Sequence, residues 1–337
     1  MKQNLFRRRA VLSWAASATL APAVLRAQTA KLPRLVTVGG ALTECVYALG
    51  AEAQLVGTDT TSLYPLAAQS TAKVGYMRTL SAEGLLALKP DAVIATTEAG
   101  PPVVLDQLRS AGVKVELIDS DHSWAEVQRK LQAVGRGAGR EAQARALQST
   151  LDADWARVQN QVAQFKGRKP RVLFILSHSA TVQVAGEKTA AHAMLQLVGA
   201  QNVMGGFNGY RPMTAEAMAA AAPDLILTTT QGIDAQGGLA TFWSRPELAL
   251  TPAFKTKALV HLDALELLGF GPRLPATVRS LHQRIVLTPR LAHCVWPPTS
   301  LQGATPAARQ SRFCGVLDES PLASVRGMVL DIVKSLT

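Results

Sequence analysis

The chain has 337 residues, of which 48% are hydrophobic and 18% are charged. This length gives room for two domains with proper cores, and the composition excludes a largely disordered protein. The formal net charge of +11 falls to +6 outside residues 1–27, because that stretch holds five of the 35 Lys and Arg residues and none of the 24 acidic ones (30 minus 24). So modest an excess, without a basic patch interleaved with aromatic residues, argues against a nucleic-acid-binding protein.

Residues 1–27 have the form of a secretory signal peptide. Basic residues between Lys2 and Arg9 precede the apolar run 10–25, and cleavage is predicted after Ala23 or Ala27. The arginine run also resembles a twin-arginine export signal. No other stretch of the sequence is long and apolar enough to span a membrane. We therefore expect an exported protein that is soluble, or tethered only by an uncleaved signal.

Strand and helix patterns alternate over residues 33–122. Short β-rich runs are separated by helical segments, the first of which is closed by Gly50. The predicted strands are 34–39, 54–57, 93–97 and 113–118, and the predicted helices are 43–49 and 102–109. This alternation indicates βαβ units and a parallel sheet, so we predict an α/β lobe.

A helical region follows at 123–168 and separates this lobe from a second one. Within it, 141–165 is rich in Ala, Gln, Leu and Arg and predicts one helix of roughly 35–40 Å, long enough to bridge two lobes. The α/β pattern restarts over 169–287. Its predicted strands include 171–176 and 258–262, and its predicted helices include 189–198 and 272–284. Residues 288–337 match nothing in either lobe and are treated as an appendage of unknown structure.

A helix–turn–strand unit occurs twice, at 80–97 and at 213–230. In each copy a Ser or Thr can cap a short helix, a Glu lies in its first turn, and a Pro-Asp pair separates the helix from an apolar run. The duplication predicts two lobes of like architecture. Equivalent positions in paired lobes face the same way, so Glu83 and Glu216 are expected to form a matched pair of surface carboxylates.

The sequence lacks the motifs of the common enzyme classes. It has no Walker-type phosphate loop, no Gly-x-Ser-x-Gly, no His-Glu-x-x-His and no paired carboxylates beside a plausible base. The glycines at 205–209 indicate a flexible loop and not a phosphate cradle. We therefore predict no catalytic residues, and an exported α/β enzyme is kept only as a remote alternative.

Three cysteines are present, too few for a disulfide framework. Cys45 falls in a helical pattern and is predicted to be a buried small residue. Cys294 and Cys314 could pair in an oxidising compartment, and the sequence leaves that pairing open.

Four segments resemble one known family. They are Thr-Ser-Leu-Tyr-Pro at 61–65, Val-Gly-Tyr-Met-Arg-Thr-Leu-Ser-Ala-Glu-Gly at 74–84, Gly-Tyr-Arg-Pro-Met-Thr-Ala-Glu-Ala at 209–217 and Gly-Phe-Gly-Pro-Arg at 269–273. In this order and spacing, residues 33–286 resemble the periplasmic binding proteins of ABC importers that have a rigid interlobe helix and carry vitamin B12, siderophores or haem. The similarity is greatest to the haem-binding branch. It implies two doubly wound, Rossmann-like lobes with a ligand cleft at the carboxyl ends of their strands.

The resemblance implies a periplasmic protein that captures ferric haem in the cleft. It would deliver haem to an inner-membrane ABC permease with its ATPase, downstream of an outer-membrane haem receptor. Cobalamin or a ferric siderophore is the alternative cargo for the same role. Tyr64 matches the position of a family tyrosine that ligates the iron, and a phenolate is a hard oxygen donor suited to Fe(III). The simpler interpretation is that Tyr64 is a turn aromatic before Pro65.

Other residues would contact the haem in this interpretation. Arg78 and Arg211 precede the two copies of the repeated helix, and a guanidinium fork suits haem propionates, although an exposed arginine is by default a solvated residue. Tyr76 would line the cleft or pack under its loop. His178 follows the first strand of the second lobe and would offer a second iron ligand, unless it is an ordinary loop residue.

The repeated carboxylates have a different predicted role. Within the family, one carboxylate per lobe pairs with arginines of the permease, and two like charges on a rigid frame would steer and orient docking. Glu83 and Glu216 are therefore predicted to dock the protein on its permease. A Glu in the first turn also stabilises its own helix dipole, which explains each residue singly but not the duplication.

Overall fold

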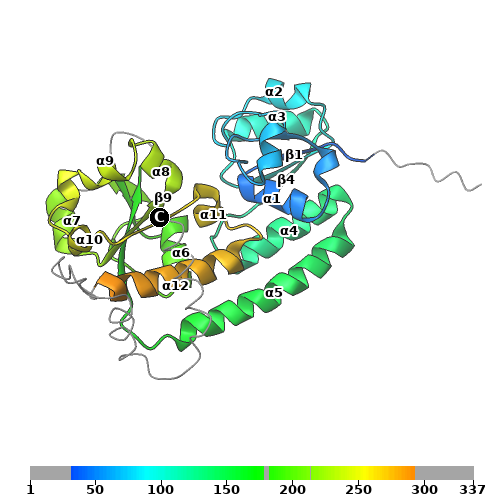
Figure 1. Ribbon diagram of the computed structural model, residues 1–337. Coiled ribbons are helices and arrows are strands. Elements are labelled where there is room, and N and C mark those ends of the chain that lie inside the picture. The colour runs from blue at the N-terminus through cyan, green and yellow to red at the C-terminus, as the bar shows by residue number, and fades with distance from the viewer. Residues whose placement is uncertain (1–31, 178–181, 213, 293–337) are drawn as a thin grey trace, which may run out of the picture.

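A computed structural model describes residues 32–177, 182–212 and 214–292, with side chains to residue 286. The predicted signal peptide at 1–27, His178, Cys294 and Cys314 lie outside the described residues, as does most of the predicted appendage. Figure 1 shows two lobes, each built around a sheet, and long helices that run along one side of both.

The first lobe has helices on both faces of its sheet. Its elements are β1 (Leu35–Val38), α1 (Gly40–Ala48), η1 (Glu52–Gln54), β2 (Leu55–Thr58), η2 (Leu66–Ser70), α2 (Ala82–Ala87), β3 (Ala92–Thr96), α3 (Pro102–Ser110), β4 (Lys114–Ile118) and the covering helix α4 (Trp124–Ala138). The strands form a parallel sheet in the order β2-β1-β3-β4. Leu35 and Ile94 enter one apolar cluster with α1 and α4, whereas Val36 and Val93 enter the other with α2 and α3. Successive strand residues point to opposite faces, so these near-continuous apolar strands bury both faces, as a doubly wound sheet requires.

The second lobe has a mixed sheet. Its elements are β5 (Arg171–Leu176), β6 (Gln183–Ala185), α6 (Ala190–Leu197), β7 (Gln201–Asn202), β8 (Tyr210–Pro212), α7 (Ala215–Ala221), β9 (Leu225–Thr229), α8 (Thr230–Asp234), α9 (Leu239–Trp243), η3 (Pro246–Leu248), α10 (Pro252–Thr256), β10 (Leu259–Leu262), α11 (Ala264–Leu268) and α12 (Leu274–Ala292). The strand order is β10-β9-β5-β6-β8, with β7 beside the start of β5. β10, β9 and β5 are parallel, whereas β6 and β8 pair antiparallel with their neighbours. The sequence does not predict β6 or β8, because strands of three residues are too short to show a period of two.

The helix α5 (Glu141–Gln164) joins the two lobes. Its 24 residues span about 36 Å at 1.5 Å per residue. Near its start Ala144 packs into an apolar cluster of the first lobe, and further along Trp155 and Val158 pack into that of the second. Figure 1 shows α5 passing alongside both α4 and α12. The predicted fold class, α/β with two doubly wound lobes and one long connecting helix, is confirmed.

The last helix is longer than the sequence pattern predicts. Val278, Leu281 and Ile285 of α12 form a buried stripe against the second-lobe core, and the predicted helix at 272–284 includes the first two of them. The helix then continues to Ala292. The boundary predicted at 287 therefore falls inside α12.

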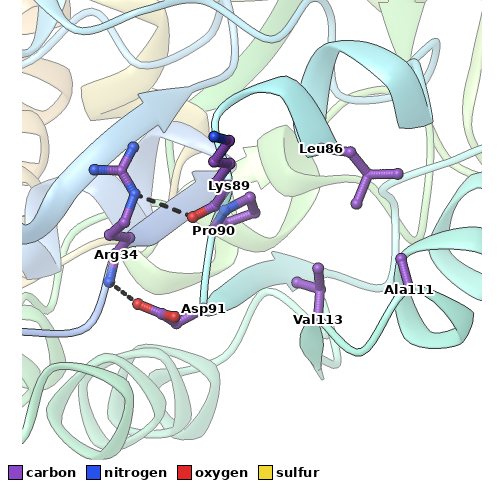
Figure 2. A pocket seen from close by; sticks show the side chains of 7 residues that line it. All are labelled: Arg34, Leu86, Lys89, Pro90, Asp91, Ala111 and Val113. Carbon is purple, nitrogen blue, oxygen red and sulfur yellow. Dashed lines mark hydrogen bonds between the residues drawn. The ribbon is translucent and has the colours of Figure 1, made fainter.

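The two copies of the repeated unit begin alike. Ser81 caps α2 and Thr214 caps α7, each by accepting from the backbone N–H three residues on, at 3.4 and 3.3 Å. In the first copy, Arg34 donates its backbone N–H to Asp91 Oδ2 at 2.7 Å and its Nε to the Lys89 carbonyl at 3.0 Å. Figure 2 shows these bonds beside a shallow hollow at the amino-terminal edge of the first sheet. This edge is opposite to the one at which the candidate site lies.

Candidate functional site

The carboxyl ends of the strands in the two sheets face each other at the junction between the lobes. Gly40, which follows β1, lies so close to Leu265, which follows β10, that a Cβ on the glycine would be 2.6 Å from Leu265 Cδ1. Beside this contact, Arg273 of the second lobe binds Glu44 of α1 through Nη2–Oε1 and Nε–Oε2 distances of 2.6 and 3.0 Å. Open α/β sheets bind ligands at this edge, so the loops after the strands form the candidate site.

A buried polar network fixes the loop that carries Tyr64. The chain leaves β2 at Thr58 and returns beside it, because Val74 N donates to the Thr58 carbonyl at 2.9 Å. Inside the loop, the buried Asp59 carboxylate accepts from Gly39 N at 3.0 Å and from the Ser62 hydroxyl at 2.8 Å. A buried carboxylate needs such donors, so the network restrains the loop on both sides of Tyr64.

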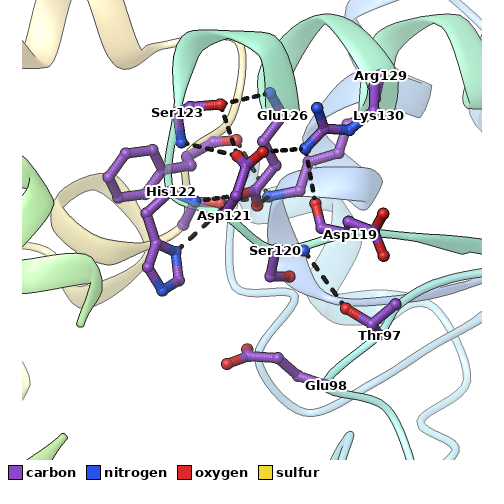
Figure 3. A network of polar contacts seen from close by, with 12 residues as sticks. Thr97, Glu98, Asp119, Ser120, Asp121, His122, Ser123, Glu126, Arg129 and Lys130 are labelled. Atoms are coloured by element: carbon purple, nitrogen blue, oxygen red, sulfur yellow. Dashed lines mark hydrogen bonds and ion pairs between the residues drawn. The ribbon is translucent and has the colours of Figure 1, made fainter. Parts of the chain in front are cut away.

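Tyr76, Arg78 and Glu98 form a contact group on the carboxyl edge of the first sheet. Arg78 Nη1 donates to the Tyr76 hydroxyl at 2.6 Å, and Arg78 Nη2 pairs with Glu98 Oε1 at 3.1 Å. Tyr76 remains 42% exposed. Glu98 comes from the loop after β3, as Figure 3 shows. Partial burial alone would lower the pKa of Arg78, but Glu98 and the Tyr76 hydroxyl outweigh it, and the pKa is raised. The guanidinium therefore stays charged and aimed at the phenol oxygen.

Tyr64 contacts the second lobe instead. Its side chain is 46% exposed, and the Arg273 Cζ lies 3.9 Å from the centroid of its ring. Within the described residues, the Tyr64 hydroxyl has no hydrogen-bond partner. Burial raises the pKa of Glu44 against the opposing effect of Arg273, and the pKa of Arg273 is raised because the charge of Glu44 outweighs partial burial. The arginine thus sits between a first-lobe carboxylate and a first-lobe ring.

Tyr210 of β8 belongs to the opposite wall. Burial raises its pKa to about 12, and the charges of Glu98 and Arg78 also act on it, so the phenol lies within electrostatic reach of the first-lobe group. Tyr210 packs on one core cluster of the second lobe, whereas its neighbour Arg211 lies with its guanidinium 3.5 Å from the centroid of the Phe207 ring. Strand residues alternate in direction, so Arg211 and Tyr210 point to opposite faces of the sheet.

The sequence interpretation missed three residues of this site. They are Arg273, which lies in the segment 269–273 that carries the family resemblance, Glu44 and Glu98. Glu98 could have been found, because it directly follows a predicted strand at the edge where ligands bind. The pairing of Glu44 with Arg273 has no local signal, because these residues lie 229 positions apart. His178, predicted as a second iron ligand, lies outside the described residues.

Glu83 and Glu216 lie where the repeat places them, in the first turns of α2 and α7. Both are exposed, and no ion pair involves either of them in the part of the chain that the structure describes. The backbone N–H of Glu216 and the Thr214 hydroxyl lower the pKa of Glu216, so this carboxyl stays ionised to lower pH than an ordinary glutamate. Each lobe thus presents one exposed negative charge on a capped helix.

Residues 32–177, 182–212 and 214–292 contain no group of three or more His, Cys, Asp or Glu side chains placed to hold a metal ion. No helix among them is long and apolar enough to cross a membrane. The family described as periplasmic binding protein matches residues 35–265. The chain belongs to this family.

Related members of the family are substrate-binding proteins. The periplasmic heme-binding protein BhuT, solved in complex with two hemes, is 45% identical, with a TM-score of 0.73 over 76% of this chain and 99% of that one. The uncharacterized ABC transporter substrate-binding lipoprotein YvrC of Bacillus subtilis is 27% identical over 75% of this chain and 79% of its own length. The vitamin B12-binding protein of Vibrio vulnificus is 25% identical over 70% and 84%. These relatives are substrate-binding proteins and not enzymes. The prediction that this member of the periplasmic binding protein family is not an enzyme is therefore confirmed.

Proposed function

We propose that this periplasmic binding protein captures ferric haem between its lobes and delivers it to an inner-membrane ABC permease with its ATPase. The observation that carries the proposal is the 2.6 Å hydrogen bond from Arg78 to the exposed phenol of Tyr76, at the edge where such folds bind ligands. The 45% identity to BhuT, which binds hemes, supports haem as the cargo. The relation to the ABC lipoprotein YvrC supports the transport partner.

The chemistry of Tyr76 suits a haem iron that is held for transport. A phenolate is a hard, anionic oxygen donor, and tyrosine is an established axial ligand of ferric haem. A cation that donates to the phenol oxygen stabilises the negative charge that the ligating oxygen carries. Arg78 is held in that position by Glu98, at 3.1 Å. The contact group therefore supplies both the ligand and its counter-charge.

Tyr64 and Tyr76 are the two candidates for the iron ligand. The assignment to Tyr64 from the sequence stays a prediction. The geometry favours Tyr76, because its oxygen has the cationic donor, whereas Arg273 lies on the ring face of Tyr64. In this proposal Tyr64 lines the end of the cleft nearest the junction of the lobes. Propionate binding by Arg78 or Arg211, iron ligation by His178, and an outer-membrane receptor upstream also stay predictions.

A hemin titration followed by absorption tests the proposal. Wild type is expected to give a saturable Soret shift with the charge-transfer band of an Fe(III)–phenolate. Tyr76→Phe should lose that band, Tyr64→Phe should keep it, and Arg78→Met should weaken affinity roughly 10- to 100-fold, as loss of a ligand's supporting hydrogen bond does. If Tyr64→Phe loses the band and Tyr76→Phe keeps it, the iron ligand is Tyr64 and not Tyr76.

The relation to a vitamin B12-binding protein keeps cobalamin as the second candidate cargo. Titration with cyanocobalamin, followed by calorimetry, is the matched experiment. Saturable binding of cobalamin together with no saturable binding of hemin would overturn haem as the cargo, while the transport role would stand. The expected result is the reverse.

A further inference from the structure

Among the described residues, two basic side chains, Lys130 and Arg273, reach across the junction between the lobes, and they differ in exposure. Lys130 of α4 donates Nζ to the Gly269 and Phe270 carbonyls of the second lobe at 2.9 and 3.2 Å. It is neutralised by Glu126 at 2.5 Å, and both side chains are at most 3% exposed. Figure 3 shows Lys130 and Glu126 side by side on α4, enclosed in a network of polar contacts.

The second contact lies at the edge of the junction. Arg273 binds Glu44 through two hydrogen bonds; the arginine side chain is 26% exposed, so solvent reaches the guanidinium, whereas the Glu44 side chain is 5% exposed. If the lobes separate, the Lys130–Glu126 pair stays intact on α4, and the Gly269 and Phe270 carbonyls lose their donor. Separation from Arg273 instead removes the cation that compensates the Glu44 carboxylate. Arg273 is therefore the contact whose ion pair is broken when the lobes open.

Close packing makes the Arg273 contact sensitive to the distance between the lobes. A Cβ added to Gly271 would lie 3.2 Å from Glu44 Oε2 and 3.3 Å from Ala41 Cβ. Gly40 is even closer to Leu265, as described above. Small residues on both sides thus let the two backbones approach, and the bidentate geometry of Arg273 with Glu44 exists only while they do.

Opening the lobes at this edge would separate Arg273 from two partners at once. Arg273 directly precedes α12 and moves with the second lobe, whereas Glu44 and Tyr64 belong to the first. Glu44 binds the guanidinium, and the Arg273 Cζ lies over the Tyr64 ring at 3.9 Å from its centroid, the arrangement in which a cation and an aromatic face attract each other. The Tyr64 ring is therefore positioned by the other lobe.

We propose that Arg273 is a positioning residue that couples closure of the lobes to retention of the cargo at Tyr64. The proposal rests on the proposed function, in which Tyr64 lines the haem cleft. With the lobes closed, Arg273 holds the Tyr64 ring against the cargo. When the importer pulls the lobes apart at this edge, the arginine leaves with the second lobe, the ring is freed, and haem dissociates faster.

The experiment measures haem dissociation and lobe separation in the same variants. Dissociation is followed by transfer of haem to excess apomyoglobin. Separation is measured in the haem-free protein by electron–electron double resonance between nitroxides at Val103→Cys and Leu250→Cys, which are exposed positions in different lobes, with Cys294→Ser and Cys314→Ser. The variants are Arg273→Met, Arg273→Lys and Glu44→Gln. Arg157→Met, which removes an exposed ion pair on α5, is the control.

Arg273→Met is expected to raise the dissociation rate about tenfold and to shift the distance distribution to longer values. Arg273→Lys should keep the distance distribution, because it retains a cation for Glu44, and should raise the rate a few-fold because it lacks the flat guanidinium. Glu44→Gln should lengthen the distances. In a Tyr64→Leu background the effect of Arg273→Met on the rate should largely disappear, a coupling that a merely structural role would not produce.

The results that would overturn the proposal are distinct from failure of the proposed function. If wild type shows no saturable hemin binding, the proposed function is wrong, while the distance measurements still test the contact. If wild type binds hemin and Arg273→Met dissociates at the wild-type rate, the proposal is wrong. A faster rate with an unchanged distance distribution would also overturn the coupling to closure. Should Arg273→Met fail to fold, Arg273→Lys and Glu44→Gln decide the same question.

Discussion

Arg34 and Arg171 occupy equivalent positions in the two lobes and make the same contacts. Arg34 precedes β1 and donates Nη2 to the Leu88 carbonyl at 2.7 Å, at the end of α2. Arg171 opens β5 and donates Nη2 to the Ala221 carbonyl at 2.6 Å, at the end of α7. The backbone N–H of each arginine also bonds the aspartate of the Pro-Asp pair in its lobe. The repeated unit therefore includes an arginine that satisfies the free carbonyls at the helix end.

Removing either arginine should destabilise its lobe. Arg171→Ala and Arg34→Ala leave partly buried carbonyls without donors, so each is expected to lower the free energy of unfolding by about 1–2 kcal/mol. Urea denaturation followed by circular dichroism measures this change. Arg109→Ala removes an exposed pair with Asp106 and should change it by less than about 0.5 kcal/mol. Equal effects in all three variants would contradict the role of the two arginines.

The matched carboxylates predict a defect in transport without a defect in binding. Glu83→Ala with Glu216→Ala should leave hemin affinity unchanged, because both side chains are exposed at helix starts and contact no cleft residue. Haem uptake by cells that carry the cognate importer should fall about tenfold, because two steering charges are lost. The control is Glu52→Ala with Glu141→Ala, which removes two other first-turn glutamates. Equal uptake in both double variants would show that helix dipoles alone explain Glu83 and Glu216.

Local patterns were sufficient to predict most of the fold. The apolar runs of β1, β3, β5 and β9 are continuous enough to be recognised, and the composition of 141–165 predicts α5 to within one residue at its end. The repeat is visible because Ser81 and Thr214 act through caps that span only three residues. Such features depend on neighbours in the chain and can be inferred without the tertiary structure.

The candidate site could be predicted only in part. Arg78 and Tyr76 are two positions apart, and the sequence placed both near the ligand, but nothing local shows that the guanidinium reaches the phenol oxygen. Arg273 meets Glu44 and Tyr64 only because the lobes close on each other, so its role depends on packing across the whole chain. The strands β6 and β8 are likewise set by their pairing with β5 and with each other, not by their own pattern.

A side chain at Gly40 should force the lobes apart. The added Cβ of Gly40→Ala would lie 2.6 Å from both Leu265 Cδ1 and the Thr61 carbonyl oxygen. We expect a loss of about 1–3 kcal/mol in the free energy of unfolding and a longer distance between the lobes. Gly84→Ala is the matched control, because its Cβ would meet only Ser81 Cβ at 3.9 Å and alanine favours the helix. If the distance between the lobes is unchanged in Gly40→Ala, the Leu265 side chain has moved aside, and the contact at Gly40 does not set the separation of the lobes.

The buried thiol of Cys45 predicts a loss of stability at high pH. Burial raises the pKa of Cys45 from its ordinary value of 9.0 to about 12, with Lys130 opposing the shift. The unfolded chain therefore loses this proton near pH 9 while the folded protein keeps it, so stability is complete below pH 9 and falls as pH rises toward 12. Between about pH 8 and about pH 10.5 this group should remove about 2 kcal/mol from the free energy of unfolding.

Cys45→Ala is the control variant. It lowers the free energy of unfolding at both pH values but lacks this titration, so its decrease between the two pH values should be smaller by about 2 kcal/mol. Urea denaturation of both proteins at the two pH values measures the difference, and the contribution of Tyr210, which also has a raised pKa, is common to both and cancels. An equal decrease in the two proteins would mean that the Cys45 thiol ionises in the folded state as readily as in the unfolded one.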